Sequence, residues 1–517
     1  MEIKLLATSD MHGYILPTNY GERNMNLPFG TAKVASTIKH IKKEANGPVV
    51  TIDNGDFIQG SPLSYFVNKS EKYRVNDLTQ VINAIGYDLG VLGNHEFNYG
   101  MDYLKQAVSS YQHNILCANI LKEDGTPIFD KAYEIKAFGD VKVAFLGVTT
   151  QYIPNWEQPA TIKGLTFKGV VETVKEYMPL LKKEADVVVV VYHGGFERDL
   201  QTGEPTELIT GENEGYALVH EVEGIDALIT GHQHRVIAQE LNGVPVVQPG
   251  QRGEYVGEIS LQVEKVNGKY IVTSSSAKLH PTGEFSTDDE IMQLVHELQV
   301  DVEEWLDQPA GKVVGDMTIT NPHEARLKEH PYIEFIQRVQ MDATGADISG
   351  TALFNNEGRG FNPIITMRDI ITNYIYPNTL AVVRMSGQDL KDAIEQTAQY
   401  FIVEDGEIKF NPVYMLPKPQ YYNYDMFEGV EYTINFSKPL GSRVVELCYK
   451  GEPLNMDATI DVVTNQYRAV GGGNYTMYGP EKIVKEVQID MTELIADYLK
   501  KYPTIEATVN HNYKVTL

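Results

Sequence analysis

The first half of the chain alternates short apolar runs with helical patterns, and this alternation limits the folds that the chain can adopt. Six runs read as buried strands by length and composition: Ile3–Thr8, Val49–Ile52, Leu89–Leu92, Val141–Val148, Val187–Tyr192 and Ala227–Thr230. Helical patterns lie between several of them, at Ala32–Lys43, Val75–Ile85, Tyr103–Tyr111 and Val170–Lys183. Such alternation predicts βαβ units in which helices cover a sheet, and therefore an α/β fold for this half.

Polar residues follow five of these runs, at the point where each strand is expected to end. The clusters are Asp10-Met11-His12, Asp53-Asn54-Gly55-Asp56, Asn94-His95, His193-Gly194-Gly195 and Gly231-His232-Gln233-His234. In open α/β sheets, ligands bind outside the carboxyl ends of the strands. The five clusters therefore predict chemistry at that edge.

The second half begins near Gly315 and is preceded by a helical pattern. Thr287–Glu290 has the S/T-x-x-E form of a capping box, apolar residues at helical spacing follow, and Asp307–Gly311 is expected to stop the helix. We interpret this helix as a bridge between two domains; a helix packed wholly within one domain is the alternative. The predicted parts are residues 1–285, 286–311 and 312–517, with an α+β fold overall.

Charge and cysteine content exclude several classes of protein. The 517 residues carry a net charge of −26, so the chain lacks the excess of cations that nonspecific binding to nucleic acid or to an anionic membrane requires. Cys117 and Cys448 are the two cysteines, far apart and without a CxxC, which argues against a disulfide framework and a thiolate zinc site.

The amino-terminal apolar run, Met1–Ala7, is too short for a signal peptide, and no later segment approaches a membrane span. The sequence as written predicts a cytoplasmic protein, and an export signal already removed is the alternative.

The donors in the polar clusters suit a divalent metal that activates water. Such sites need neutral imidazoles and carboxylates on rigid backbone, with positions left open for water and substrate. Asp10 and His12 are two residues apart, so both can face one side of an extended strand end. A lone histidine is more often solvated or capped than a ligand. That interpretation is given to eight of the 13 histidines: His40, His113, His220, His280, His296, His323, His330 and His511.

The ordered set D-x-H, G-D, G-N-H-E, H-G-G and G-H-x-H resembles the calcineurin-like dinuclear metallophosphoesterases. The second half extends the resemblance to the bacterial 5′-nucleotidase and 2′,3′-cyclic-nucleotide 2′-phosphodiesterase/3′-nucleotidase group. The resemblance implies a four-layer sandwich of helix, sheet, sheet and helix in the first domain. It implies an α+β nucleotide-recognition domain in the second.

The resemblance also implies two divalent metal ions. One would be held by Asp10, His12, Asp56 and His234, and the other by Asp56, Asn94, His193 and His232. Asp56 would bridge the two ions, which lie about 3.5–4 Å apart in such sites. Oxygen and nitrogen ligands without thiolate suit manganese, zinc, iron or cobalt, and the sequence does not choose among them.

In such a site a hydroxide between the metals attacks phosphorus in line, and His95 contacts the phosphate or protonates the leaving alkoxide. A purely supporting role is the alternative for His95. Asn98 stands where the 5′-nucleotidase branch usually has an aspartate that orients and charges this imidazole. Asparagine can hydrogen-bond the ring but cannot supply a full charge. Asp53 is expected to form a turn, and Glu96 is expected to be structural.

Hydrolysis of a nucleotide also needs a grip on the base, and aromatic rings stack any base with about 1–3 kcal/mol each. The resemblance places two stacking aromatic residues in the second domain, and Tyr424 and Tyr467 match them. Tyr422 and Phe427 compete for the first position, and Tyr475 competes for the second.

Two further residues of the second half are candidates for substrate binding. Arg359, in the loop Asn355–Gly360, would meet an anionic or sugar group through its guanidinium. That loop departs from the commoner N-G-G-G-I-R form, and a solvated loop arginine is the alternative. Tyr376–Thr379 resembles the family's P-F-x-N-T turn, so Asn378 is expected to support the pocket.

The leading hypothesis is a hydrolase acting on small-molecule nucleotides, rather than on nucleic-acid polymers or at a membrane. Asn98 favours the 2′,3′-cyclic-nucleotide 2′-phosphodiesterase/3′-nucleotidase branch. A 5′-nucleotidase, acting on nucleoside 5′-monophosphates or nucleotide sugars, is the runner-up. A catalytically silent nucleotide- or metal-binding protein and a protein phosphatase are the alternatives from other classes.

Overall fold

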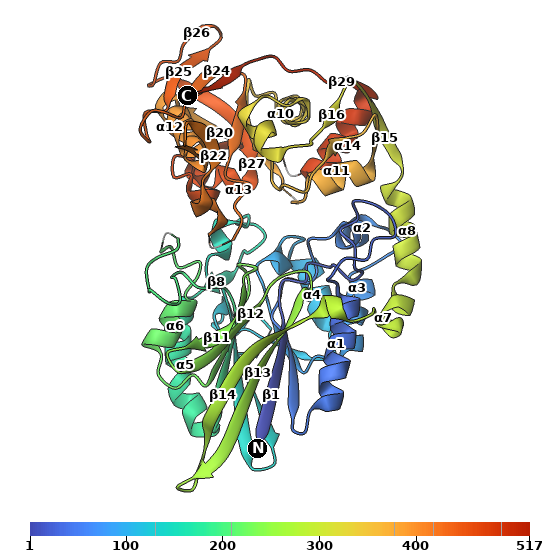
Figure 1. The fold of residues 1–517 in the computed structure, drawn as a ribbon, viewed down its shortest axis with the longest axis vertical. Coiled ribbons are helices and arrows are strands. Elements are labelled where there is room, and N and C mark those ends of the chain that lie inside the picture. The colour runs from blue at the N-terminus through green and yellow to red at the C-terminus, as the bar shows by residue number, and fades with distance from the viewer. Residues whose placement is uncertain (130, 208, 377, 417, 488) are drawn as a thin grey trace. The chain divides into compact units, whose positions relative to one another are not determined.

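The computed structural model describes residues 1–129, 131–207, 209–376, 378–416, 418–487 and 489–517. Within it the chain forms two compact units, Met1–Val302 and Glu303–Leu517 (Figure 1). No helix of the described residues is long and apolar enough to cross a membrane.

The first unit contains two six-stranded mixed sheets. Strand order in one is β14 (Lys269–Pro281), β13 (Tyr255–Val266), β1 (Glu2–Thr8), β2 (Val49–Asp53), β3 (Leu89–Val91) and β4 (Asn114–Leu116). In the other it is β11 (Val236–Leu241), β12 (Val244–Pro249), β10 (Ala227–Ile229), β9 (Val187–His193), β7 (Val141–Thr149) and β6 (Tyr133–Phe138). The strands from β1 to β4 are parallel, as are β7, β9, β10 and β12.

The five consecutive valines of β9 show how the layers are built. Val187, Val189 and Val191 pack in the core between the sheets, together with residues of β1, β2 and β3. Val188 and Val190 face the opposite side, where they pack with residues of α5 (Val170–Glu184) and α6 (Gly215–Glu221). Because successive side chains of a strand point to opposite faces, an uninterrupted apolar run belongs to a strand buried on both.

Helices cover the outer faces of the two sheets. Figure 1 shows α5 and α6 on one side of the unit, and α1 (Thr31–Glu44) and α3 (Asn76–Ile85) on the other. The unit also contains α2 (Pro62–Lys69) and α4 (Met101–Ser110). The four-layer sandwich is confirmed, and each of the six predicted strands and four predicted helices of this half agrees with an observed element to within two residues.

The predicted bridging helix differs from the structure in two details. Its N-cap is Asp288, whose side chain accepts hydrogen bonds from the amides of Glu290 and Ile291, so the prediction of a capping box headed by Thr287 is wrong. The helix is also interrupted at Val295, which separates α7 (Asp289–Leu294) from α8 (His296–Leu306). The division between the compact units falls within α8. The bridging role and the limits 1–285, 286–311 and 312–517 stay a prediction.

The second unit is built on a five-stranded sheet of β23 (Asp425–Glu428), β17 (Ile348–Ala352), β27 (Thr459–Asn465), β20 (Leu380–Ser386) and β28 (Ile483–Val487). Smaller sheets contain β15 (Pro309–Val314), β19 (Ile364–Thr366) and β29 (Thr504–Glu506), and β24 (Glu431–Asn435), β25 (Val444–Tyr449), β26 (Glu452–Pro453) and β30 (Tyr513–Thr516). Its main helices are α10 (Pro331–Thr344), α11 (Met367–Asn373), α12 (Gly387–Thr397), α13 (Gln466–Ala469) and α14 (Met491–Lys501). This arrangement confirms the α+β prediction.

Candidate metal centre

The predicted metal ligands follow the carboxyl ends of parallel strands in both sheets of the first unit. Asp10, Asp56 and Asn94 come after β1, β2 and β3. His193 is the last residue of β9, and His232 and His234 come after β10. Six of the seven side chains are buried, and only His234 is partly exposed.

The backbone at these positions is strained. Five of the seven candidate ligands have positive φ: Asp10 (55°), His12 (49°), Asp56 (59°), His232 (66°) and His234 (56°). Residues other than glycine adopt this region at a cost, and such residues gather at functional sites. β1, β2 and β10 are therefore each followed by a sharp turn that carries a candidate ligand.

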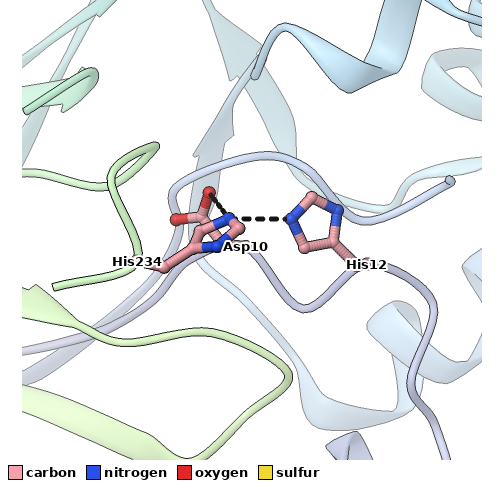
Figure 2. A group of neighbouring side chains, drawn as sticks. All are labelled: Asp10, His12 and His234. Carbon is pink, nitrogen blue, oxygen red and sulfur yellow. Dashed lines mark hydrogen bonds and ion pairs between the residues drawn. The ribbon is translucent and has the colours of Figure 1, made fainter. Parts of the chain in front are cut away.

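One group of donors consists of Asp10, His12 and His234 (Figure 2). The Nε2 atoms of His12 and His234 lie 3.1 Å apart, and His234 Nε2 lies 3.4 Å from Asp10 Oδ1. Asp10 is itself fixed, because both of its carboxylate oxygens accept from the amide of His232 at 3.0–3.1 Å.

A second group of donors shares Asp10 and adds Asp56 and His193. His193 Nε2 lies 3.2 Å from Asp56 Oδ2 and 3.9 Å from Asp10 Oδ1. Beside it, His232 Nδ1 lies 2.8 Å from Asn94 Oδ1. The His193 and His232 rings are 5.8 Å apart between centroids, so these donors adjoin one another.

Three of the histidines hold their outer ring nitrogen against an oxygen acceptor. His12 Nδ1 lies 3.1 Å from the carbonyl oxygen of Gln59, and His193 Nδ1 lies 2.6 Å from that of Asn54. His232 Nε2 lies 2.8 Å from a carboxylate oxygen of Glu212. A proton on the outer nitrogen leaves a lone pair on the inner one, which is the usual arrangement around metal-binding histidines.

Two buried atoms at the centre also suit a bound cation. Asp56 Oδ2 and His193 Nε2 face each other at 3.2 Å, and neither atom makes a hydrogen bond of good geometry among the described residues. Two glycines make room for the carboxylates, because a Cβ on Gly93 would lie 2.1 Å from Asp56 Oδ1 and one on Gly231 would lie 2.8 Å from Asp10 Oδ2. Buried polar atoms are normally satisfied, so the residues present fit a bound divalent metal.

The pKa values of the buried carboxyl and imidazole groups at the centre also agree with a site for a divalent cation. Burial alone would raise the pKa of Asp56, but the His193 and His95 imidazoles lower it well below its usual range. Burial alone would lower the pKa of His193, but the carboxylates of Asp56 and Asp10 raise it to about 10. Burial lowers the pKa of His12 to about 3. Without metal, His193 thus carries the positive charge that the buried carboxylates need, and a metal ion would displace that proton.

Glu96 and Asp53 support the turn that carries Asp56. The Glu96 carboxylate accepts from the amides of Asp56 (2.8 Å), Phe57 (2.8 Å) and Gly93 (2.6 Å), which agrees with the structural role expected for it. Asp53 accepts from the amide of Gly55 at 3.3 Å, as a turn former would. Burial raises the pKa of Asp53 to about 8.

His95 reaches the same centre from η1 (His95–Phe97). Its ring lies edge-on to that of His12, with centroids 5.1 Å apart. His95 Nδ1 lies 2.6 Å from Asn98 Oδ1, and Asn98 Nδ2 donates to Glu157 Oε1 at 2.5 Å. Burial raises the pKa of the Glu157 carboxyl, while the hydrogen bond from the Asn98 amide and the nearby His95 imidazole oppose that rise.

The aromatic candidates of the second unit differ in exposure. Tyr424 is only 1% exposed and packs against Tyr400 and Phe401, with ring centroids 5.5 and 5.2 Å away. A ring enclosed in this way offers no face to a base. Among its competitors, Phe427 and Tyr475 are equally buried.

Tyr422 and Tyr467 are both partly exposed and adjoin each other. Their ring centroids are 5.9 Å apart, with the planes at 90°. Tyr467 lies on the short helix α13, which the side chain of Asn465 caps by accepting from the amide of Arg468. Tyr467 and Tyr422 are thus accessible in this unit and Tyr424 is not, while the roles of Tyr424 and Tyr467 in stacking a base stay predictions.

The two remaining candidates lie in loops of the second unit. Arg359 is exposed, and its carbonyl accepts from the amide of Ile319 at 2.7 Å. Asn378 is partly buried, and its carbonyl accepts from the amide of Met491 at 2.9 Å. Pro377 of the proposed turn lies outside the described residues. The substrate-binding roles of Arg359 and Asn378 stay predictions.

Two contacts of the centre could not be found in the sequence. Glu157 and Glu212 lie in irregular segments far along the chain from Asn98 and His232, and neither belongs to a motif. In the sequence each is simply an acidic residue in a loop, and because many loops of the chain contain acidic residues, nothing distinguishes these two.

Comparison with known proteins identifies both halves of the chain. A family model described as calcineurin-like phosphoesterase matches residues 3–236. A second, described as 5′-nucleotidase, C-terminal domain, matches residues 310–480. The two matches lie in the first and second compact units.

Individual relatives agree with these matches. The trifunctional nucleotide phosphoesterase protein YfkN of Bacillus subtilis is 28% identical over 100% of this chain, which spans only 39% of that protein. A 2′,3′-cyclic-nucleotide 2′-phosphodiesterase/3′-nucleotidase of Haemophilus influenzae is 28% identical over 99% of this chain and 86% of its own length. A Staphylococcus aureus protein, provisionally named a 5′-nucleotidase and solved with α-ketoglutarate, is 39% identical with full coverage of both chains and a TM-score of 0.93.

Calcineurin-like phosphoesterases use divalent metals, and the donor groups described above suit them. The fold, both family matches and a relative of 39% identity over its whole length agree. The chain therefore belongs to the calcineurin-like phosphoesterases that carry a 5′-nucleotidase C-terminal domain, and it is a hydrolase of phosphoester bonds.

Proposed function

We propose that the chain hydrolyses 2′,3′-cyclic nucleotides and 3′-nucleotides. The observation that carries this choice of substrate is the asparagine at position 98, which hydrogen-bonds the His95 ring where an aspartate is usual in 5′-nucleotidases. Similarity to a relative named for these two activities, over 99% of this chain, supports it.

We also propose a dinuclear centre. Asp10, His12, Asp56 and His234 would hold one divalent ion, and Asp56, Asn94, His193 and His232 would hold the other. The support is the two donor groups that share Asp10, which bring together five of the seven residues, and the adjoining pair of His232 and Asn94. Divalent ions in such a site provide an activated water and neutralise charge on the phosphoryl oxygens.

The chain's own residues supply the proton. With Nδ1 donating to Asn98 Oδ1, His95 has Nε2 left for the substrate. As the bond between phosphorus and the leaving oxygen breaks, the doubly protonated His95 ring would pass its Nε2 proton to that oxygen and become neutral, with the remaining proton on Nδ1. Such general acid catalysis contributes about 10²–10⁴-fold when the leaving group is a poor one, as a ribose alkoxide is.

Tyr422 and Tyr467 are the proposed stacking rings for the base. Their partial exposure and their perpendicular contact support this assignment. Stacking tolerates any base, so these rings would add affinity with little base preference.

A substrate panel with manganese or zinc tests the proposal. We expect phosphate release from 3′-AMP, and conversion of 2′,3′-cyclic AMP through 3′-AMP to adenosine. Release only from 5′-AMP would establish the 5′-nucleotidase alternative. If no nucleotide releases phosphate, the proposed activity is refuted, and the alternative of a catalytically silent nucleotide- or metal-binding protein remains.

A further inference from the structure

Glu157 lies beside the His95 end of the centre, where it contacts Asn98, the hydrogen-bond partner of His95. It lies just after the single turn η2 (Ile153–Asn155), and its amide donates to the carbonyl of Ile153 at 3.0 Å. The next residue back, Trp156, has its ring 5.4 Å from that of His232 and 5.3 Å from that of Tyr152. The turn is therefore packed against the centre, and Glu157 is held in place.

The contact that Glu157 makes decides which way the Asn98 amide points. Glu157 Oε1 accepts a hydrogen bond from Asn98 Nδ2 at 2.5 Å, so the NH₂ of the amide faces Glu157. The carbonyl oxygen of the amide then faces His95 Nδ1 at 2.6 Å. Because that oxygen only accepts, Nδ1 must carry the proton.

We propose that Glu157 is a positioning residue, which orients the Asn98 carboxamide and through it sets the tautomer of the His95 ring. This inference rests on the proposed hydrolytic function, in which His95 Nε2 gives a proton to the leaving oxygen. An aspartate at position 98 would have only acceptors and would need no such partner. An asparagine has a donor and an acceptor on one planar group, so a neighbour must choose between its two orientations.

With Glu157→Gln, both orientations of the Asn98 carboxamide become possible, because a glutamine can either donate to Asn98 or accept from it. We expect kcat for 3′-AMP to fall about 10–100-fold, as when the outer partner of a site histidine is lost. KM should change little, since Glu157 makes no direct contact with substrate in the proposal. With p-nitrophenyl phosphate, kcat should stay near the wild-type value, because nitrophenolate leaves without needing a proton.

Adding Asn98→Asp to Glu157→Gln should restore activity. The introduced aspartate would accept from His95 Nδ1 through one oxygen and from the amide of the introduced glutamine through the other. We expect the double variant to hydrolyse 3′-AMP faster than the Glu157→Gln single variant. Asn155→Ala is the matched control, since this exposed side chain in the same turn donates to the carbonyl of Tyr152 at 3.1 Å.

The tautomer can also be read directly, without any substrate. Nitrogen NMR of zinc-loaded protein labelled with ¹⁵N-histidine distinguishes a protonated Nδ1 from a protonated Nε2, and a His95→Asn variant identifies the His95 signals. The spectra are recorded over a range of pH, and wherever the His95 ring is neutral the wild type should show its one proton on Nδ1. Glu157→Gln should show a mixture of tautomers.

Three results would overturn the inference. The first is that Glu157→Gln keeps the wild-type kcat for 3′-AMP. The second is that it loses activity equally on 3′-AMP and p-nitrophenyl phosphate. The third is that the double variant hydrolyses 3′-AMP no faster than Glu157→Gln alone. Failure of the proposed function is a separate outcome. If the wild type releases no phosphate from any nucleotide, the NMR measurement still decides the role of Glu157.

Discussion

Glu96→Gln should loosen the loop that carries Asp56. In the wild type, Glu96 is 4% exposed and accepts from four backbone N–H groups. One oxygen accepts from Asp56 and Gly93, and the other accepts from Phe57 and, at 3.5 Å, from Ile58. Glutamine has one oxygen where glutamate has two, so at least one of these buried donors must lose its acceptor.

The contacts determine the size of the effect. The less costly orientation keeps the glutamine oxygen against Asp56 and Gly93 and turns its NH₂ toward the Phe57 amide. An orphaned buried donor costs about 1–3 kcal/mol, and changing the acceptor of each remaining bond from charged to neutral costs about 1 kcal/mol. The loop should therefore lose about 3–5 kcal/mol of local stability.

Hydrogen–deuterium exchange over the loop measures this loss. Exchange at the amides of Asp56 and Phe57 should become about 10²–10⁴-fold faster, because local opening sets its rate. Metal retained after dialysis should fall as well, since Asp56 is a proposed ligand.

Glu395→Gln is the matched control for Glu96→Gln. Glu395 is a buried carboxylate of the second unit that accepts from the amides of Arg443 (3.0 Å) and Val444 (2.8 Å). Its substitution should destabilise its own loop and leave metal content unchanged. If amide exchange in Glu96→Gln stays at the wild-type rate, or if both variants lose metal equally, Glu96 does not stabilise the metal-binding loop in the way described.

Three further predictions concern metal, base and pH. Asp56→Asn should weaken metal binding at least about 10³-fold, because the loss of one unit charge at 4 Å costs about 4 kcal/mol. Metal analysis and phosphate release measure this effect, and a variant that keeps both its metal and its activity would contradict the prediction. Tyr467→Ala, like Tyr422→Ala, should raise KM for nucleotides by the loss of about 1–3 kcal/mol of stacking, while hydrolysis of a small aryl phosphate is spared; equal loss on both substrates would indicate a folding defect. Burial alone would raise the pKa of Glu258, but hydrogen bonds from His280 and Lys4 lower it, so its stabilising contribution is present above its unfolded pKa and is lost as pH falls. Glu258→Gln should therefore lower Tm by the equivalent of about 1–3 kcal/mol at pH 7, and this gap to the wild type should narrow in acid; a gap independent of pH would contradict the assignment.

Much of the first unit was predictable from local pattern. A run such as Val187–Val191 has no polar residue to turn toward water, so it must be a strand buried on both faces. Once the parallel strands are recognised, their carboxyl ends meet at the edges of the two sheets. The placement of Asp10, Asp56 and His193 at or just after strand ends therefore predicted chemistry at that edge, and the three side chains do lie together.

Prediction was weaker where burial depends on the whole fold. Tyr424 and Tyr422 are two residues apart in one aromatic stretch, and nothing local separates them. In the structure Tyr424 is enclosed in the core of the second unit, while Tyr422 is partly exposed. The helix cap shows the same limit on a smaller scale, since Thr287 and Asp288 can both cap and only the backbone at that point selects Asp288.

The sequence by itself determined the alternation of strands and helices, the polar strand ends and the identity of the donor atoms, because these depend on side-chain chemistry at fixed spacing. Only the tertiary structure decided how those donors are oriented. Glu157 sets the amide of Asn98, and Glu212 holds the outer nitrogen of His232, across long separations in the chain. A hydrogen bond is directional and short, so its partner is chosen by how the folded segments meet rather than by neighbours in sequence.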